Sequence, residues 1–206
     1  MEALEWLGHS GFKLKISGKT IYIDPFKINT AEPADLILIT HDHYDHCSVE
    51  DIMKIATNNT LIFVTADSQS KLSNYPGKVL VVEPNGGYKL GDMVIRTIPA
   101  YNTNKMFHPK ENGWVGYVIE HNGEKLYHAG DTDAIPEMKN LQNIDYALLP
   151  VSGEYVMNAE EAASAANMIR PKIAVPMHYN AIVGSVSDAE RFKSLCKCQV
   201  KIMEKL

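Results

Sequence analysis

The sequence predicts an α/β fold in which two β-sheets pack face to face and helices cover the outside. The chain opens with short alternating apolar runs separated by turns, and strand-like and helix-like segments then alternate over the remainder. Each sheet has to bury one face, and stacking two sheets with helices outside satisfies this order of elements. No fixed-period repeat, low-complexity segment or linker interrupts the chain, so we expect one domain spanning residues 1–206.

The first third of the chain is expected to consist mostly of strands. Alternating runs cover residues 4–7, 12–16 and 20–23, and the turn Ser17-Gly18-Lys19 predicts a hairpin between the last two. The apolar run at residues 36–39 predicts a buried strand. Ser48 is a favourable N-cap with Asp51 three residues later, so a short helix is expected from there to about Thr57.

Strands and helices alternate over the rest of the chain. A hairpin of residues 114–120 and 125–127 is expected around Asn122-Gly123, and a helix capped by Asn158, with Glu161 three residues on, is expected to end at residue 169. Residues 100–113 lack periodicity and predict a long loop. Residues 88–99 predict a second hairpin, interrupted at Gly91-Asp92. The other expected strands are 61–65, 79–82, 145–149, 172–175 and 200–203, and the other expected helices are 66–73 and 186–195.

Composition narrows the classes of function. The apolar fraction of 45% and the charged fraction of 22% are ordinary for a globular chain. The net charge is −5 and no Lys/Arg run stands out, which disfavours a nucleic-acid surface or an anionic membrane partner. No apolar run has the length of a membrane span, and the start of the chain lacks the features of a signal peptide. Three cysteines form no disulfide framework, so we expect a reducing, cytoplasmic setting.

The stretch His41-Asp42-His43-Tyr44-Asp45-His46 indicates a metal site. Three imidazoles and two carboxylates lie within six residues, directly after a buried strand. Burying several titratable groups is costly unless each has a partner, and a divalent cation is the natural partner. His41 and His43 are able to aim ring nitrogens at one ion, while Asp45 and His46 are able to reach a second.

Further candidate ligands fall at the ends of strands. His108 lies in the long loop, Asp131 follows the strand at 125–127, and His178 follows the strand at 172–175. A carboxylate between two metals is able to bridge them, and Asp131 has that place in the order of residues. Two sites with open positions would leave room for water.

The pattern resembles the metallo-β-lactamase superfamily. The resemblance rests on His41-x-His43-x-Asp45-His46, a later histidine, Gly130-Asp131 and a last histidine after a strand. It extends over the whole chain, and within the superfamily it is greatest for small metal-dependent hydrolases related to ascorbate-phosphate lactonases and to N-acyl-phosphatidylethanolamine phospholipase D. It implies an αββα sandwich of two mixed β-sheets flanked by helices. It also implies two divalent metal ions at one edge, usually Zn²⁺ and sometimes Mn²⁺ or iron.

By position, the resemblance assigns His41 and His43 to the first metal with a third histidine. Asp45, His46 and His178 are assigned to the second metal, with Asp131 as the bridge. The third histidine is where this sequence departs, because relatives often place it at the position that is Asn102 here. His108, six residues later, is the expected replacement, with Asn102 or water as the alternatives.

Other residues near these ligands are expected to orient them or to contact substrate. Asp24 ends a strand and is expected to orient a ligand imidazole. Phe107, Tyr101 and Trp114 are expected to belong to the core or the rim rather than to a substrate clamp. The other residues expected to orient the ligands or to contact substrate are His9, Asn102, Lys110, His128, Tyr179 and Asn180.

The expected activity is hydrolysis of an ester, lactone or phosphoester bond by a hydroxide held between two metals, with Asp45 and Asp131 as catalytic residues. Two dications, less the two carboxylates and the hydroxide, leave a net charge of roughly +1, which favours a small anionic substrate. The alternatives are a nuclease or RNA-processing enzyme of the same fold, an iron-dependent redox enzyme, and a non-catalytic metal-binding module. The sequence leaves open whether the protein is a homo-oligomer.

Overall fold

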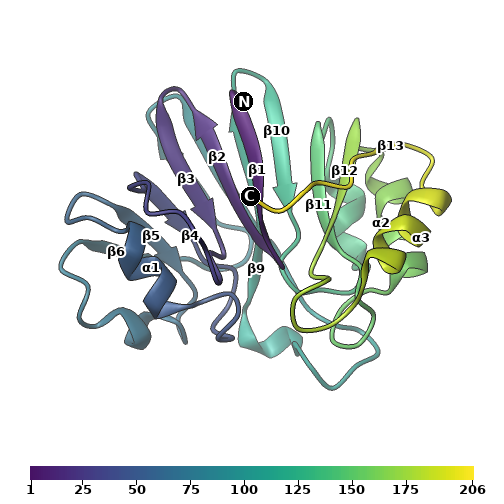
Figure 1. Cartoon of the computed structure of the whole chain (residues 1–206), viewed down its shortest axis with the longest axis horizontal. Coiled ribbons are helices and arrows are strands. Elements are labelled where there is room, and N and C mark those ends of the chain that lie inside the picture. The colour runs from purple at the N-terminus through teal and green to yellow at the C-terminus, as the bar shows by residue number, and fades with distance from the viewer. The chain divides into compact units, whose positions relative to one another are not determined.

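The computed structural model describes residues 1–206, which form two compact units. The first comprises residues 1–83 and 204–206, and the second comprises residues 84–203. Each unit contains one mixed β-sheet together with its own helices (Figure 1). The expectation of a single domain stays a prediction.

The first unit is built on a six-stranded sheet in which the strands follow in sequence order. β1, β2 and β3 are antiparallel, and β3 to β6 are parallel. Ser17 and Gly18 both have positive φ, at 49° and 68°, which is the geometry of the tight hairpin turn expected between β2 and β3. The strands are β1 (Ala3–Gly8), β2 (Gly11–Ile16), β3 (Lys19–Ile23), β4 (Leu36–Leu38), β5 (Leu61–Val64) and β6 (Lys78–Val81).

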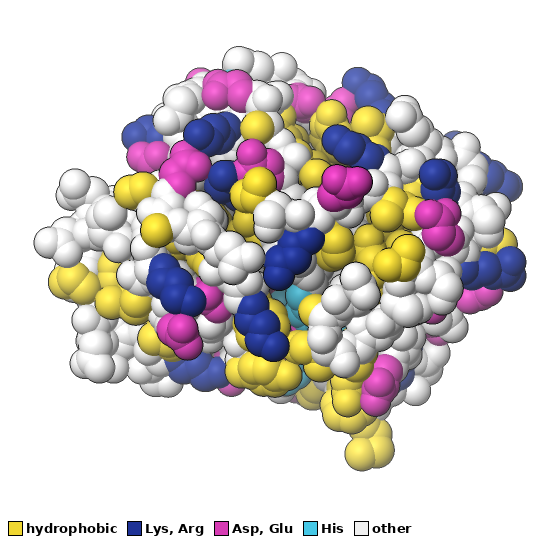
Figure 2. Space-filling model, in the orientation of Figure 1, with side chains coloured by type: hydrophobic (Ala, Val, Ile, Leu, Met, Phe, Trp, Pro, Cys, Tyr) yellow, Lys and Arg dark blue, Asp and Glu magenta, His cyan; other side chains and the backbone are white.

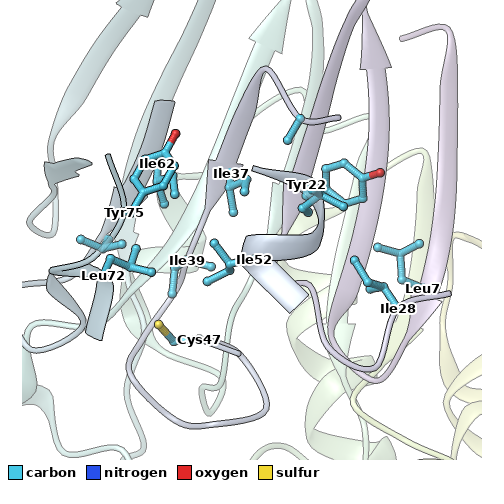
Figure 3. Packing of buried hydrophobic residues seen from close by; sticks show 13 residues of the cluster. Leu7, Tyr22, Ile28, Ile37, Ile39, Cys47, Ile52, Ile62, Leu72 and Tyr75 are labelled. Atoms are coloured by element: carbon cyan, nitrogen blue, oxygen red, sulfur yellow. The ribbon is translucent and has the colours of Figure 1, made fainter. Parts of the chain in front are cut away.

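Helix α1 (Val49–Ile55) packs its apolar side on this sheet. Tyr22 of β3, Ile37 of β4 and Ile62 of β5 form a buried cluster with Ile52 of α1 (Figure 3). Alternate residues of the strands reach this cluster because successive side chains of a strand point to opposite faces. The Ser48 side chain accepts a hydrogen bond from the Asp51 amide, so the expected N-cap is confirmed.

The expected helix at residues 66–73 is wrong. Only a 3₁₀ helix forms there, at Gln69–Leu72. The Thr65 hydroxyl donates to the Asp67 carboxylate at 2.5 Å and lies 2.9 Å from the Ser68 hydroxyl. Such local side-chain hydrogen bonds compete with the regular helix at its start.

The second unit is built on a seven-stranded sheet in the order β13-β12-β11-β10-β9-β8-β7. β10 to β13 are parallel, and β7 to β10 are antiparallel. Asn122 and Gly123 have φ of 49° and 79°, which confirms the expected turn between β9 and β10. The strands are β7 (Gly87–Leu90), β8 (Met93–Pro99), β9 (Val115–His121), β10 (Glu124–His128), β11 (Tyr146–Pro150), β12 (Ile173–Met177) and β13 (Gln199–Val200).

Helices α2 (Ala159–Ile169) and α3 (Val186–Leu195) lie side by side next to β11 and β12 (Figure 1). The capping box of Asn158 and Glu161 is present, as expected. The last strand is shorter than the expected 200–203, because β13 pairs only with Ile173 and Ala174 of β12. Two further 3₁₀ helices, at Lys110–Asn112 and Pro136–Asn140, were not expected from periodicity.

None of the helices combines the length and the apolarity needed to span a membrane. On the face of the molecule shown in Figure 2, Lys and Arg side chains are interspersed with Asp and Glu side chains and form no continuous band.

Candidate functional site

The first unit gathers four of the predicted ligands in the loop between β4 and α1. His41 Nε2 lies 3.0 Å from His43 Nδ1, so two ring nitrogens converge on one point. His46 Nε2 lies 3.6 Å from Asp45 Oδ2. The loop thus brings together atoms of the kinds that bind metal ions, and their assignment to metals stays a prediction.

His9 joins Asp45 from the turn between β1 and β2. Its Nε2 lies 2.8 Å from Asp45 Oδ2, and both residues are buried. The His9 backbone has φ of 52°, and its carbonyl accepts a hydrogen bond from the Trp6 indole at 2.9 Å. The indole therefore helps to hold an unusual backbone conformation that turns the His9 ring toward Asp45.

A buried carboxylate, Asp24, supports two of the ligand imidazoles. Asp24 Oδ2 accepts from His46 Nδ1 at 2.8 Å and from the Thr40 hydroxyl at 2.6 Å, and Asp24 Oδ1 accepts from the Thr40 amide at 2.8 Å. Because a carboxylate accepts from the ring, His46 carries its proton on Nδ1 and presents the lone pair of Nε2.

Thr40 fixes the tautomer of His41 in the same way. Its hydroxyl proton is used in the bond to Asp24, so its oxygen accepts from His41 Nδ1, at 2.9 Å. His41 therefore also presents an Nε2 lone pair, and this nitrogen is the one that faces His43. Two imidazoles are thus fixed in the tautomer that binds a metal through Nε2.

The second unit brings three predicted ligands together around one oxygen atom. Asp131 Oδ2 lies 3.2 Å from His108 Nε2 and 3.1 Å from His178 Nε2. All three side chains are buried. They come from three places in the chain, namely the loop between β8 and β9 and the segments that follow β10 and β12. A carboxylate oxygen between two imidazoles has the arrangement expected of a bridging ligand.

On its Nδ1 side, opposite Nε2, the His108 ring contacts the backbone of Tyr155. The Tyr155 carbonyl lies 3.1 Å from His108 Nδ1, and it also accepts from the Asn102 side-chain amide at 2.7 Å. Asn102 Nδ2 lies 3.3 Å from the same ring nitrogen, so Asn102 stands on the Nδ1 side of His108. Asn102 Oδ1 is buried without a hydrogen-bond partner.

The donor set of the second unit fits a metal ion. A carbonyl only accepts, so His108 Nδ1 carries the proton and Nε2 turns a lone pair toward Asp131 Oδ2. Two electron-rich atoms 3.2 Å apart repel each other unless a cation or a proton lies between them. Imidazole and carboxylate are ligands that Zn²⁺, Mn²⁺ and iron accept.

His178 is supported by Ser152, whose hydroxyl lies 2.9 Å from His178 Nδ1. Ser152 follows β11 just as Asp131 follows β10 and His178 follows β12. Parallel strands end at the same edge of a sheet, so this placement could have identified Ser152 from the sequence. Thr40, directly before the motif, could have been found in the same way, whereas the Tyr155 carbonyl has no sequence signal.

The other predicted residues have varied surroundings. Lys110 forms an ion pair with Glu137 at 3.1 Å and lies over the Tyr101 ring. His128 is buried, and its Nδ1 accepts from the Gly130 amide at 3.1 Å. Tyr179 is buried and Asn180 is exposed, directly after His178.

Cys47, next to His46, does not have the properties of a ligand. It belongs to the apolar cluster of the first unit, where Figure 3 shows it near Ile39 and Ile52. Burial raises the pKa of its thiol to about 11, so the thiolate that a metal requires is disfavoured.

Comparison with known proteins identifies the class. A family model for the beta-lactamase superfamily domain matches residues 3–178. A UPF0173 metal-dependent hydrolase of Thermococcus onnurineus is 35% identical over an alignment of 220 positions, which covers 99% of this chain and 97% of the relative. A solved structure from Parabacteroides distasonis, assigned as a metal-dependent hydrolase, has a TM-score of 0.87 at 34% identity and covers 98% of this chain and 92% of its own. Igni18, a metallo hydrolase from Ignicoccus hospitalis, has a TM-score of 0.79 at 27% identity, with 98% and 94% covered.

Two mixed β-sheets with flanking helices and histidines at the strand ends define the metallo-β-lactamase fold, so the expected fold class is confirmed. The chain belongs to the β-lactamase superfamily. At the level of this family, the expectation of a metal-dependent hydrolase is confirmed as well.

Proposed function

We propose that this protein hydrolyses an ester, lactone or phosphoester bond of a small anionic substrate at a centre of two divalent metal ions. The observation that carries the proposal is the position of Asp131 Oδ2, 3.2 Å from His108 Nε2 and 3.1 Å from His178 Nε2. A buried carboxylate that meets two imidazoles through one oxygen is suited to join two metal ions.

In this proposal, the ligands are those that the positions of the motif residues assign. His41, His43 and His108 would hold the first metal, and Asp45, His46 and His178 would hold the second, with Asp131 shared by both. The tautomers support the assignment, because His41, His46 and His108 each carry the ring proton on Nδ1 and present Nε2. Zn²⁺ is the metal proposed, and Mn²⁺ or iron would suit the same donors.

Two bound dications would lower the pKa of a bound water to about 7 and polarise the substrate oxygen. Asp45 orients the attacking water and takes its proton, while His9 Nε2, 2.8 Å from Asp45 Oδ2, holds that carboxylate in place. The water oxygen forms a bond to carbon or phosphorus, the bond to the leaving oxygen breaks, and the proton passes from Asp45 to that oxygen. The formal charge of the centre, roughly +1, attracts an anionic substrate to a chain of net charge −5. The proposed setting is the cytoplasm.

Metal analysis followed by a substrate panel tests the proposal. Protein purified without added chelator is expected to contain two metal equivalents per chain by elemental analysis. It should hydrolyse at least one member of a panel of phosphodiesters, lactones and carboxylate esters, lose that activity on chelation, and regain it with Zn²⁺, Mn²⁺ or Fe²⁺. Activity that persists after thorough metal removal would refute the proposal.

A further inference from the structure

The loop between β8 and β9 exposes two apolar side chains directly before a proposed metal ligand. Met106 is 95% exposed and Phe107 is 49% exposed, whereas His108 is 2% exposed. Tyr101 and Trp114, at the two ends of the same loop, are buried. Tyr101 and Trp114 therefore belong to the core, whereas the exposed Phe107 and Met106 contribute little to it.

The exposed tip belongs to a well-anchored loop. Asp133, a buried carboxylate, accepts hydrogen bonds from the Thr103 amide at 2.7 Å and the Asn104 amide at 3.4 Å, and it pairs with Lys105. The Asn102 amide donates to the His108 carbonyl at 2.8 Å, which closes the loop. A loop held in this way loses little conformational entropy when a ligand binds to its tip.

Tyr155 connects the apolar tip to the proposed metal ligand. Its ring meets the Phe107 ring edge to face, with the centroids 4.8 Å apart and the planes at 88°. Its carbonyl lies 3.1 Å from His108 Nδ1. The residue that holds the His108 imidazole therefore also holds the Phe107 ring, so the apolar surface lies beside the imidazole.

We infer that Phe107, Met106 and the Tyr155 ring form a binding surface for an apolar group of the substrate. The inference rests on the proposed function and specifies its substrate class, a compound with an aryl or alkyl group next to the anionic group that is hydrolysed. Exposed aromatic and thioether side chains gain free energy when an apolar group covers them, and aromatic pairs add a further preference for rings.

Inert phosphonates test this surface without turnover. Methylphosphonate, butylphosphonate and phenylphosphonate are titrated into the metal-loaded protein by calorimetry. Phenylphosphonate is expected to bind about tenfold more tightly than methylphosphonate, the gain expected when roughly 50–60 Å² of apolar surface leaves water. In Phe107→Ala this ratio should fall to about threefold or less, with the affinity for methylphosphonate unchanged.

Controls separate this inference from the proposed function. Val186→Ala removes an apolar side chain of equal exposure, 49%, from α3 and should leave the ratio unchanged. Met106→Ser provides a second variant at a fully exposed position and should also lower the ratio. Equal binding of methylphosphonate and phenylphosphonate would overturn the inference of an apolar surface without contradicting the proposed metal centre. Binding of neither compound would overturn both the inference and the proposed function. A dimer that dissociates in Phe107→Ala with an unchanged ratio would identify the surface as a self-interface and overturn the inference.

Discussion

Asp24 and His46 form a fully buried pair in which Asp24 Oδ2 accepts from His46 Nδ1 at 2.8 Å, and neither side chain is exposed. A neutral imidazole has one ring proton, and the carboxylate determines which nitrogen carries it. The lone pair that remains on Nε2 is directed toward the Asp45 side of the ring, because His46 Nε2 lies 3.6 Å from Asp45 Oδ2. Asp24 thus fixes the tautomer in which His46, a proposed metal ligand, presents Nε2.

Asp24→Asn should weaken metal binding by about 10-fold to 100-fold, the usual effect of losing a carboxylate behind a ligand histidine. The amide oxygen retains one acceptor, but its NH₂ group would face either the His46 ring N–H or the Thr40 hydroxyl. Competition with a chromophoric chelator measures the affinity. Asp145→Asn is the control, since Asp145 is also buried but pairs with Lys172 and the Lys125 amide. Equal losses of affinity in the two variants would show that the effect is general destabilisation.

Thr40 is expected to determine the tautomer of His41. Thr40→Val removes the hydroxyl that links Asp24 to His41 Nδ1, so the ring of the metal-free protein should become a mixture of tautomers, whereas Thr40→Ser should keep the proton on Nδ1. Ring ¹⁵N chemical shifts report the tautomer directly, and metal affinity should fall about tenfold in the valine variant only. The control is Thr60→Val, which loses a buried hydroxyl bonded to the Ala34 carbonyl. A single Nδ1–H tautomer in Thr40→Val would contradict the expectation.

Local patterns predicted the parts of this structure that depend on neighbouring residues. The strand expected at 36–39, which forms at Leu36–Leu38, the caps at Ser48 and Asn158 and the turn at Asn122-Gly123 each have their cause within a few residues. The helix expected at 66–73 does not form, because local side-chain hydrogen bonds compete with it at its start. Hydrophobic periodicity gives no information about such bonds.

Supporting contacts between distant residues were beyond sequence reasoning. Asp131 and His178 were expected as ligands because they follow strands, and His108 because it is the histidine of the long loop. The carbonyl of Tyr155, 47 residues from His108, is a backbone atom that any residue could supply. Lys110 was expected near the site as a neighbour in sequence, and its ion pair with Glu137, 27 residues away, depends on how the loop folds. Only tertiary structure determines such pairs.

Asp131→Ala should reduce bound metal and lower the hydrolysis rate at least about 100-fold while the protein stays folded. Removal of the carboxylate leaves His108 and His178 without the oxygen that both approach. Elemental analysis and circular dichroism measure the two effects separately. Full metal content in this variant would argue that Asp131 does not bridge.

His108 and Asn102 are distinguished by a pair of alanine variants. His108→Ala should lose one of the two metal equivalents, because its Nε2 faces Asp131. Asn102→Ala should keep both with an affinity lowered at most about tenfold, since its amide donates to the Tyr155 carbonyl behind the ring. Elemental analysis after dialysis decides between them. Loss of one equivalent in Asn102→Ala but not in His108→Ala would assign the ligand position to Asn102.

Asp51 is expected to make the first unit sensitive to acid. Burial raises the pKa of Asp51, but hydrogen bonds from the Ser48 hydroxyl, the Lys54 ammonium and the amides of Lys27 and Ile28 outweigh burial and hold the pKa below its ordinary value. The folded state therefore binds the Asp51 proton less readily than the unfolded state. The resulting stability is present above the unfolded pKa of about 3.9 and is lost as the pH falls through the lower, folded pKa.

Asp51→Asn should lower the free energy of unfolding by about 2 kcal/mol at pH 7, because several hydrogen bonds lose their charged acceptor. Urea unfolding at pH 7, 5 and 3.5 measures the difference, which should shrink at the lowest pH because the unfolded wild type takes up a proton at Asp51 there. Glu50→Gln is the matched control, since Glu50 lies in the same first turn of α1 with its side chain 84% exposed. A difference between wild type and Asp51→Asn that stays constant down to pH 3.5 would show that packing, and not the charge of Asp51, stabilises the start of α1.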